Sequence, residues 1–342
     1  MNRIATLDVL RFFSAMAVVL YHYIARPEAQ AFQGLEPIAQ YGYLGVPIFF
    51  MISGYVISLS AENRTAYQFA VSRFVRLYPA LWFGVVFTSL VLFLLNDTAL
   101  DFQKILANMT LLNDYLGISN IDGVYWTLQA ELKFYGCVFM LVALGLFQHY
   151  KAWLTVWLAV TVSHLISQQP SIMGWFISPS YSPFFIIGVV FYLIQKKGFD
   201  SYNILVFLIS SALCIYQTGE QASNFIRGVT ESERLIACLV VMVSMFAFLA
   251  ISRGWISIKG SAVTYSIGAL TYPLYLLHNS AGKAIIDSSL AAFIGEEVLV
   301  VVTTLVMLVL SYWVYRFVER PSAHLLRSLL FPKAIFGEGR VN

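Results

Sequence analysis

Long apolar segments recur along almost the whole chain, and they limit its possible folds more than any other feature. A helix needs about 20 mostly apolar residues to cross a bilayer. Ten segments come near that length, at residues 7–24, 42–60, 78–95, 128–148, 152–167, 176–194, 202–217, 234–251, 264–282 and 297–317. Because lipid offers no partner to an open backbone, each segment should be helical. We therefore expect an all-α fold, a polytopic transmembrane helix bundle with about ten spans, of which 152–167 is the weakest.

The composition excludes several other classes of protein. Apolar residues make up 59% of the chain and charged residues only 11%, whereas a soluble domain carries about 25% charged residues. The net charge of +3 is too small to indicate nucleic acid as a partner. Cys137, Cys214 and Cys238 all lie inside apolar segments. We expect them to be buried small hydrophobic residues, and neither disulfides nor metal ligands.

The distribution of basic residues predicts how the chain is oriented. Cytoplasmic loops of membrane proteins carry an excess of Lys and Arg. With the N-terminus in the cytoplasm, 14 of these residues fall on the inner side and 5 on the outer side, while Arg11 and Lys133 lie within spans. We expect both termini in the cytoplasm of a multi-pass protein of the cell (inner) membrane. Short links predict one integral-membrane domain over 1–342, with the spans inside 7–317 and a cytoplasmic tail at 318–342.

The first span carries three ionisable residues, each of which is costly to insert into a membrane. Arg11 and His22 are eleven residues apart, about three turns, so they share one helix face and lie roughly 16 Å apart along the axis. Asp8 precedes Arg11 by three residues and can form an ion pair with it. Two interpretations stay open: a functional face, or an arginine that reaches the cytoplasm and a histidine in the outer interface.

Two other spans present polar residues on one face. Thr127, Glu131 and Tyr135 follow each other by four, which fits either the capped start of a helix or a carboxylate at the depth of His22. In the second span, Ser53 stands beside small residues. Such residues allow close helix packing, and Ser53 could equally line a cavity.

Two pairs of residues near the ends of spans also have two interpretations. Arg73 and Arg76 are three apart and could grip phosphate oxygens, or they could only set the orientation of the chain. Tyr275 and His278 share a face of the ninth span, where tyrosines also form aromatic belts at membrane surfaces. No histidine has metal-ligand spacing with another potential ligand, so no metal is expected.

Six motifs together resemble membrane acyltransferase family 3, the integral-membrane O-acyltransferases that modify bacterial surface glycans. The motifs are Leu7-Asp8-x-Leu10-Arg11 with His22, Phe49-Phe50-x-x-Ser53-Gly54-Tyr55, Arg73-x-x-Arg76-x-Tyr78-Pro79, Trp126-Thr127-Leu128-x-x-Glu131, Tyr272-x-x-Tyr275-x-x-His278, and Glu319-Arg320-Pro321. They occur in the order of the family and cover residues 7 to 321. One departure is Thr127, where the family often has Ser.

The resemblance implies transfer of an acyl group, with acetyl favoured, from cytoplasmic acetyl-CoA to a hydroxyl of a cell-envelope glycan or lipid-linked sugar. A sugar hydroxyl is a weak nucleophile and needs a base with a pKa near neutral, which suits His22. Glu131 would orient its imidazole. Arg11, in its structural ion pair with Asp8, would line the path of the donor.

The remaining roles concern the two substrates. Arg73 and Arg76 would hold the phosphates of the acyl-CoA. The residues expected to contact the acceptor or the developing oxyanion are Tyr275, His278, Ser53 and Trp126. No bound cofactor is expected, since acetyl-CoA is a substrate. The expected partners are the glycan acceptor, the lipid bilayer and polysaccharide-assembly proteins.

Two other functions remain possible from the sequence. A transporter or flippase for a lipid-linked sugar or polysaccharide could use the same intramembrane charges as a pathway. Many transporters contain an internal repeat, and none is visible here. A membrane structural or sensor subunit would need the histidines only as interfacial residues.

Overall fold

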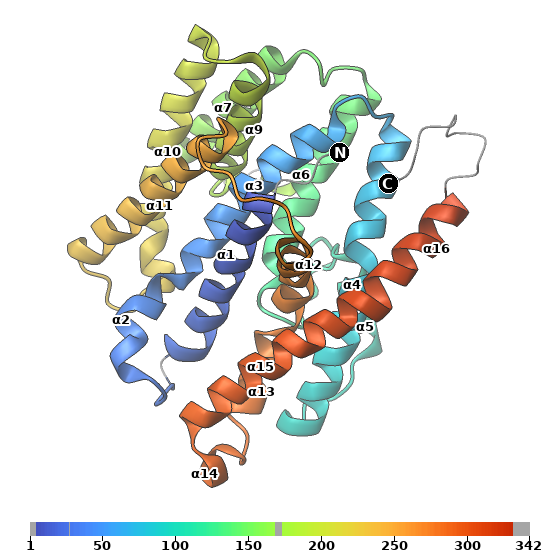
Figure 1. Cartoon of the computed structure of the whole chain (residues 1–342), viewed down its shortest axis with the longest axis vertical. Coiled ribbons are helices and arrows are strands. Elements are labelled where there is room, and N and C mark those ends of the chain that lie inside the picture. The colour runs from blue at the N-terminus through green and yellow to red at the C-terminus, as the bar shows by residue number, and fades with distance from the viewer. Residues whose placement is uncertain (1–4, 27, 168–172, 331–342) are drawn as a thin grey trace.

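The chain folds into helices. The computed structural model describes residues 5–26, 28–167 and 173–330, and within these ranges no β-strand occurs (Figure 1). The long helices are α1 (Ala5–Ile24), α3 (Gly45–Ala61), α4 (Ala66–Asn96), α6 (Tyr125–Ala143), α7 (Tyr150–Ser167), α9 (Ser182–Lys197), α10 (Ser201–Phe225), α11 (Glu231–Ser252), α12 (Ala262–Leu277) and α15 (Glu296–Val314). The short elements are α2 (Glu36–Ala39) between the 3₁₀ turns Gln33–Leu35 and Gln40–Leu44, α5 (Phe102–Thr110), α8 (Met173–Phe176), α13 (Ser280–Ile286), α14 (Ala291–Ile294), a π turn at Tyr315–Glu319, and α16 (Arg320–Leu330). The all-α prediction is confirmed, and each predicted segment overlaps one long helix.

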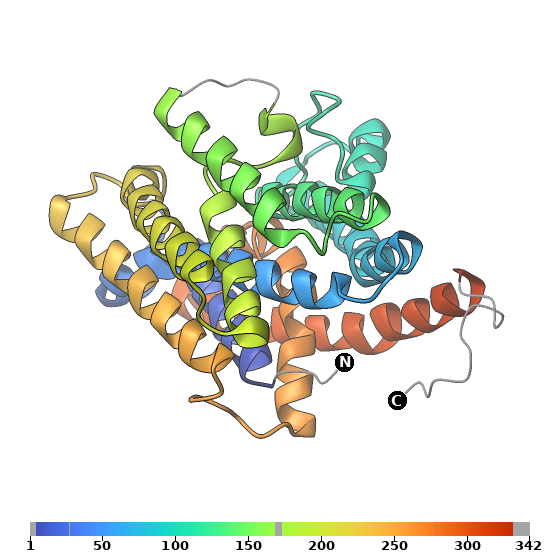
Figure 2. The same cartoon turned by 90° about the horizontal axis from the view of Figure 1, so that it is seen from above.

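Several of these helices could cross a membrane. Six regions of the described chain are long and apolar enough, namely Ala5–Ile24, Gln33–Ala61, Ala66–Asn96, Ser201–Phe225, Glu231–Ser252 and Glu296–Leu330. Helix α12 is apolar but shorter. The chain is thus a multi-pass membrane protein, while the count of about ten spans and the cytoplasmic termini stay predictions. Residues 331–342 of the tail predicted at 318–342 lie outside the described part. Helix α16 continues the line of α15 and lies against α4 (Figures 1 and 2).

The centre of the bundle depends on a close crossing between α3 and α9. A Cβ atom added at Gly54 would lie 2.2 Å from the carbonyl oxygen of Phe185, and one at Gly188 would lie 2.1 Å from that of Met51. Only glycine allows two backbones to approach this closely. The packing interpretation of the small residues in the second span is therefore confirmed.

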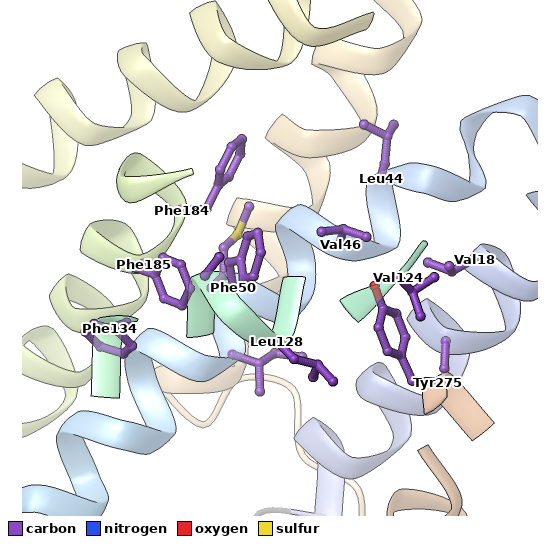
Figure 3. Packing of buried hydrophobic residues seen from close by; sticks show 14 of the residues in the cluster. Val18, Leu44, Val46, Phe50, Val124, Leu128, Phe134, Phe184, Phe185 and Tyr275 are labelled. Carbon is purple, nitrogen blue, oxygen red and sulfur yellow. The ribbon is translucent and has the colours of Figure 1, made fainter. Parts of the chain in front are cut away.

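Aromatic rings fill the space around this crossing. The rings of Phe50 and Phe185 are 4.6 Å apart, and those of Phe134 and Phe185 are 4.7 Å apart (Figure 3). These three buried residues come from α3, α9 and α6. They hold α6 against the central pair and so fix the position of its polar face.

Glycines also bring α1 close to its neighbours. A Cβ at Gly45 would lie 2.4 Å from the carbonyl oxygen of Ser14, and one at Gly268 of α12 would lie 2.4 Å from the Cβ of Asp8. Helix α1 is therefore packed against both α3 and α12. Because His22 and His278 meet at the C-terminal ends of α1 and α12, these two helices run in the same direction.

The cysteines follow the sequence prediction only in part. All three are free. Cys214 is buried, but Cys137 and Cys238 are half-buried. The prediction that all three are buried was wrong for these two, because they lie on parts of α6 and α11 that no other helix covers completely.

The crossing of α3 and α9 makes a direct prediction about stability. Gly54→Ala should lower the thermal unfolding midpoint of the detergent-solubilised protein, because overpacking costs about 1–3 kcal/mol. Gly136→Ala in α6 is the matched control, since a Cβ there meets no atom within 4 Å. Equal midpoints for Gly54→Ala and the wild type, measured by size-exclusion chromatography after heating, would contradict the packing account.

Orientation can be tested with single cysteines in a cysteine-free background. We expect Gln33→Cys to react with an impermeant thiol reagent added to intact cells, and Gln68→Cys to react only after the membrane is opened. Gln33 is exposed, and Gln68 lies in the first turn of α4. The reverse pattern of labelling would overturn the orientation inferred from Lys and Arg.

Candidate active site

One face of α6 contacts three other helices through polar or aromatic side chains. Thr127 Oγ1 lies 2.9 Å from the hydroxyl of Tyr275. Glu131 accepts a hydrogen bond from Ser53. The ring of Tyr135 lies 5.9 Å from the guanidinium of Arg73. The predicted shared face therefore exists, and it forms a polar row of about 12 Å along α6.

A second row on α12 runs beside the first. His278 lies next to His22, Tyr275 lies next to Thr127, and the ring of Tyr272 lies 5.4 Å from the guanidinium of Arg76. The two rows therefore lie side by side and run between the same two ends of the site. One end carries two imidazoles, and the other carries arginines.

Helix α1 contributes to both ends of these rows. Arg11 Nη1 lies 3.9 Å from Asp8 Oδ1, which confirms the predicted ion pair. Arg11 also interacts electrostatically with Arg76. About three turns further along, His22 reaches the other end, as its spacing from Arg11 predicts.

The two imidazoles are joined by a hydrogen bond that fixes their tautomers. His22 Nδ1 lies 3.0 Å from His278 Nε2. His278 Nδ1 lies 2.9 Å and 3.1 Å from the carbonyl oxygens of Tyr275 and Leu274. A carbonyl can only accept, so His278 Nδ1 carries a proton and its Nε2, in the neutral ring, accepts one from His22 Nδ1. Nε2 of His22 is then left with an available lone pair.

Buried neighbours hold His278 in this orientation. The hydroxyl of Tyr23 donates to the carbonyl oxygen of His278 over 2.8 Å. Asp122 is fully buried and accepts hydrogen bonds from Asn279 Nδ2 at 2.7 Å and from the amide of Ser280 at 2.8 Å. Its carboxylate interacts electrostatically with His278. The pair is thus part of a packed, hydrogen-bonded end of α12.

Sequence reasoning missed Asp122 and Tyr23. Asp122 lies in the long loop before α6, where an acidic residue also suits the start of a helix. Tyr23 directly follows His22 inside an apolar segment, where a tyrosine is common. The available signal was one acidic residue in the loop directly before a span.

The expected contact between Glu131 and His22 does not form in the described part of the chain. No hydrogen bond joins the two in the described part of the chain, and the imidazole is oriented by His278 instead. Glu131 is one turn beyond Thr127 on α6, and Thr127 is already level with Tyr275. The carboxylate therefore lies about two turns from the imidazoles along the helix axes, against Ser53.

Two other expectations are changed by local geometry. Thr127 is not an N-cap: α6 begins two residues earlier, and the Thr127 hydroxyl lies within hydrogen-bonding distance of the carbonyl oxygen of Val124. Trp126 packs on the rings of Tyr181, at 4.8 Å, and Phe50, at 6.3 Å. The structure thus gives Trp126 a place in the aromatic packing beside the row.

The two predicted phosphate-binding arginines have different surroundings. Arg76 forms an ion pair with the buried Glu319. Arg73 Nη2 donates to the hydroxyl of Ser60 over 3.2 Å, and its guanidinium lies over the rings of Phe69 and Tyr135. A carboxylate neutralises Arg76, whereas the contacts of Arg73 in the described chain are hydroxyls and rings.

Comparison with known proteins identifies the kind of chemistry that this site serves. The model of acyltransferase family 3, described as an acyltransferase domain, matches residues 4–316. The chain belongs to this family. The match covers every residue of the two rows and confirms the resemblance seen in the sequence motifs. As a family member, the protein is an acyltransferase.

Curated relatives agree with this family. An O-acetyl transferase of Shigella phage Sf6 is 23% identical over 362 aligned residues, which cover 95% of this chain and 99% of the relative. Acyltransferase MdmB of Streptomyces mycarofaciens is 27% identical over 146 residues, which cover 39% of this chain and 38% of the relative. No solved structure matches the chain.

The imidazole pair predicts how acyl transfer responds to changes at His278. His278→Ala removes the acceptor for His22 Nδ1, and losing a hydrogen bond to a group that becomes charged costs 1.5–3 kcal/mol, so we expect kcat to fall about 10- to 150-fold. His278→Gln keeps a carbonyl that can accept and should retain more activity than Ala. The measurement is the acyl-transfer rate in membranes that contain equal amounts of each protein. Wild-type kcat for His278→Ala would contradict the pairing.

Proposed function

We propose that the protein transfers an acyl group, with acetyl favoured, from cytoplasmic acyl-CoA to a hydroxyl of a cell-envelope glycan or lipid-linked sugar. The observation that carries this proposal is the hydrogen-bonded pair of His22 and His278. It stands at one end of two rows of side chains whose other end carries Arg73 and Arg76. On this proposal the protein acts in the cell (inner) membrane, beside polysaccharide-assembly proteins.

His22 acts as the general base. Its Nε2 accepts the proton of the acceptor hydroxyl as the oxygen attacks the thioester carbonyl. The resulting imidazolium donates from Nδ1 to His278 Nε2, a hydrogen bond that strengthens as His22 gains charge. When the tetrahedral intermediate collapses, the C–S bond breaks and the thiolate of CoA takes the proton from His22. The products are the ester and free CoA.

Tyr275 is the donor that we assign to the developing oxyanion. Its hydroxyl lies 2.9 Å from Thr127 Oγ1. When Thr127 donates to the Tyr275 hydroxyl, the proton of Tyr275 itself is available to a substrate oxygen. His278, the other residue expected in this role, already uses both ring nitrogens within the protein.

The two substrates approach from opposite ends of the rows. The phosphates of acyl-CoA would bind at the arginine end, and the pantetheine arm would extend past Arg11 and Glu131 toward His22. Glu131 and Ser53 hold each other at the middle of this path and would line it. The acceptor would reach His22 from the other side of the membrane.

A transporter of lipid-linked sugar is less well supported. Family membership and the O-acetyl transferase relative both favour group transfer. A transporter also has no need for a histidine whose tautomer is fixed by a second histidine so that its Nε2 can accept a proton. A transporter would move glycan across the membrane without consuming acetyl-CoA. An assay of acetyl transfer from acetyl-CoA to glycan therefore distinguishes it from an acyltransferase.

The proposal is tested by replacing the base. We expect His22→Ala to reduce the transfer of labelled acetyl groups from acetyl-CoA to envelope glycan about 10²- to 10⁴-fold, the usual contribution of a general base. His164→Ala in α7 is the matched control and should keep the wild-type rate, because His164 lies outside the polar rows. Normal acetylation by a well-expressed His22→Ala protein would refute the assignment.

A further inference from the structure

A lysine lies beside the two imidazoles at the end of the rows that is opposite to the arginines. Lys283 belongs to α13, whose first residue directly follows Asn279, one position after His278. Its ammonium interacts electrostatically with both His22 and His278. Lys283 is half-buried, and its side chain forms no salt bridge or hydrogen bond in the described part of the chain. The site thus contains a cation whose charge no contacting group balances.

Close packing holds α13 at the level of the imidazoles. A Cβ atom added at Gly282 would lie 2.0 Å from the hydroxyl oxygen of Tyr23. Tyr23 directly follows His22 in α1, and its hydroxyl donates to the carbonyl oxygen of His278. Helix α13 also packs against α4 and α15 (Figure 1). Lys283 is therefore on a fixed element of the site and not on a free loop.

Three acidic residues of this end have other partners. Asp287 follows Lys283 by four residues, a spacing that favours an ion pair along a helix, but its carboxylate contacts Arg26 instead. Glu296 contacts the same arginine over 3.1 Å. Asp122 accepts three hydrogen bonds from neutral donors. None of the three forms a salt bridge with Lys283 within the described residues.

The position of this cation affects base catalysis. A positive charge near His22 raises the free energy of the imidazolium that forms when His22 takes a proton. A negative charge held by Lys283 offsets this effect, because it attracts the imidazolium. The arrangement therefore favours a reaction in which a substrate brings an anionic group to this end of the site.

We propose that Lys283 binds an anionic group of the acceptor glycan, a carboxylate or a phosphate, and so selects negatively charged acceptors. This inference rests on the proposed function and names the class of acceptor that the same site takes. The ammonium holds the anion by charge-assisted hydrogen bonds, while Nε2 of His22 takes the proton of a nearby hydroxyl. Because Lys283 acts on the ring of His22, the anion and the reacting hydroxyl belong to the same sugar or to directly linked groups.

The first experiment changes the charge of the acceptor. De-O-acetylated envelope glycan is supplied in three forms: unchanged, with its carboxylates converted to neutral methylamides by carbodiimide and methylamine, or with its phosphates removed by aqueous hydrofluoric acid. We expect the wild-type kcat/KM for acetyl transfer to fall about 10- to 150-fold with one of the two altered forms, the effect of losing one charge-assisted hydrogen bond. The form that causes the fall identifies the anion. Equal kcat/KM values for all three forms would overturn the inference.

Substitution of Lys283 tests the same contact from the side of the protein. Lys283→Met should lower kcat/KM for the unchanged glycan by the same factor and should abolish the difference between charged and neutral forms. Lys283→Arg keeps the charge and should keep that difference. Lys104→Met is the matched control, because Lys104 is also half-buried and lies in α5, which packs against α4. A Lys283→Met protein that still prefers the charged glycan by the wild-type factor would contradict the contact.

A protection measurement separates this inference from the proposed function. Vesicles that contain the full-length protein are treated with sulfosuccinimidyl acetate, an impermeant reagent that acetylates amines, and the modification of Lys283 and Lys104 is followed by mass spectrometry. We expect the charged glycan to slow modification of Lys283 but not of Lys104, and the neutral form to slow neither. If this protection holds but no acetyl group is transferred from acetyl-CoA, the proposed function fails and the anion site stands. Equal modification of Lys283 with both forms refutes the site, whatever the transfer activity.

Discussion

The hydrogen bond between His22 and His278 is the interaction on which the active-site account depends. It owes its direction to the last turn of α12, where the carbonyl oxygens of Tyr275 and of Leu274, which also accepts from the His278 amide, lie next to His278 Nδ1. Because a carbonyl oxygen there accepts a hydrogen bond from His278 Nδ1–H, the other nitrogen is an acceptor and the Nε2 lone pair of His22 stays available. A feature of every helix terminus is thus used to select a tautomer. The positions of α1 and α12, set by glycine contacts such as that of Gly268 with Asp8, bring the two rings together.

The apolar character of the chain explains why polar groups occur as rows. Each ionisable group in a membrane is costly unless it finds a partner. Glu131 finds its partner, Ser53, on a facing helix, and Asp8 finds Arg11 one turn further along the same helix. Together the rows on α6 and α12 join an end that carries arginines to an end that carries two imidazoles. This arrangement suits a reaction whose donor is in the cytoplasm and whose acceptor is outside.

The sequence predicted the helices and the shared faces well, because both follow from local periodicity. The common face of Thr127, Glu131 and Tyr135 and the pairing of Asp8 with Arg11 are correct. What could not be predicted depends on how helices cross and loops dock. Glu131 lies about two turns from the imidazoles because of the axial position of α6 against α12. Asp122 and Arg64 lie in segments between helices, and no periodic pattern marks their contacts. Family motifs identified candidate residues of the site but not which of them touch each other.

Transfer between the two sides of the membrane tests the central claim most directly. Vesicles containing the purified protein in one orientation are loaded with labelled acetyl-CoA on the cytoplasmic side, and de-O-acetylated envelope glycan is supplied only on the opposite side. The account predicts that label enters the glycan, that external CoA-degrading enzyme does not prevent this, and that His22→Ala vesicles show no transfer. Label that appears only when donor and acceptor are placed on the same side would contradict a path joining the arginines to His22.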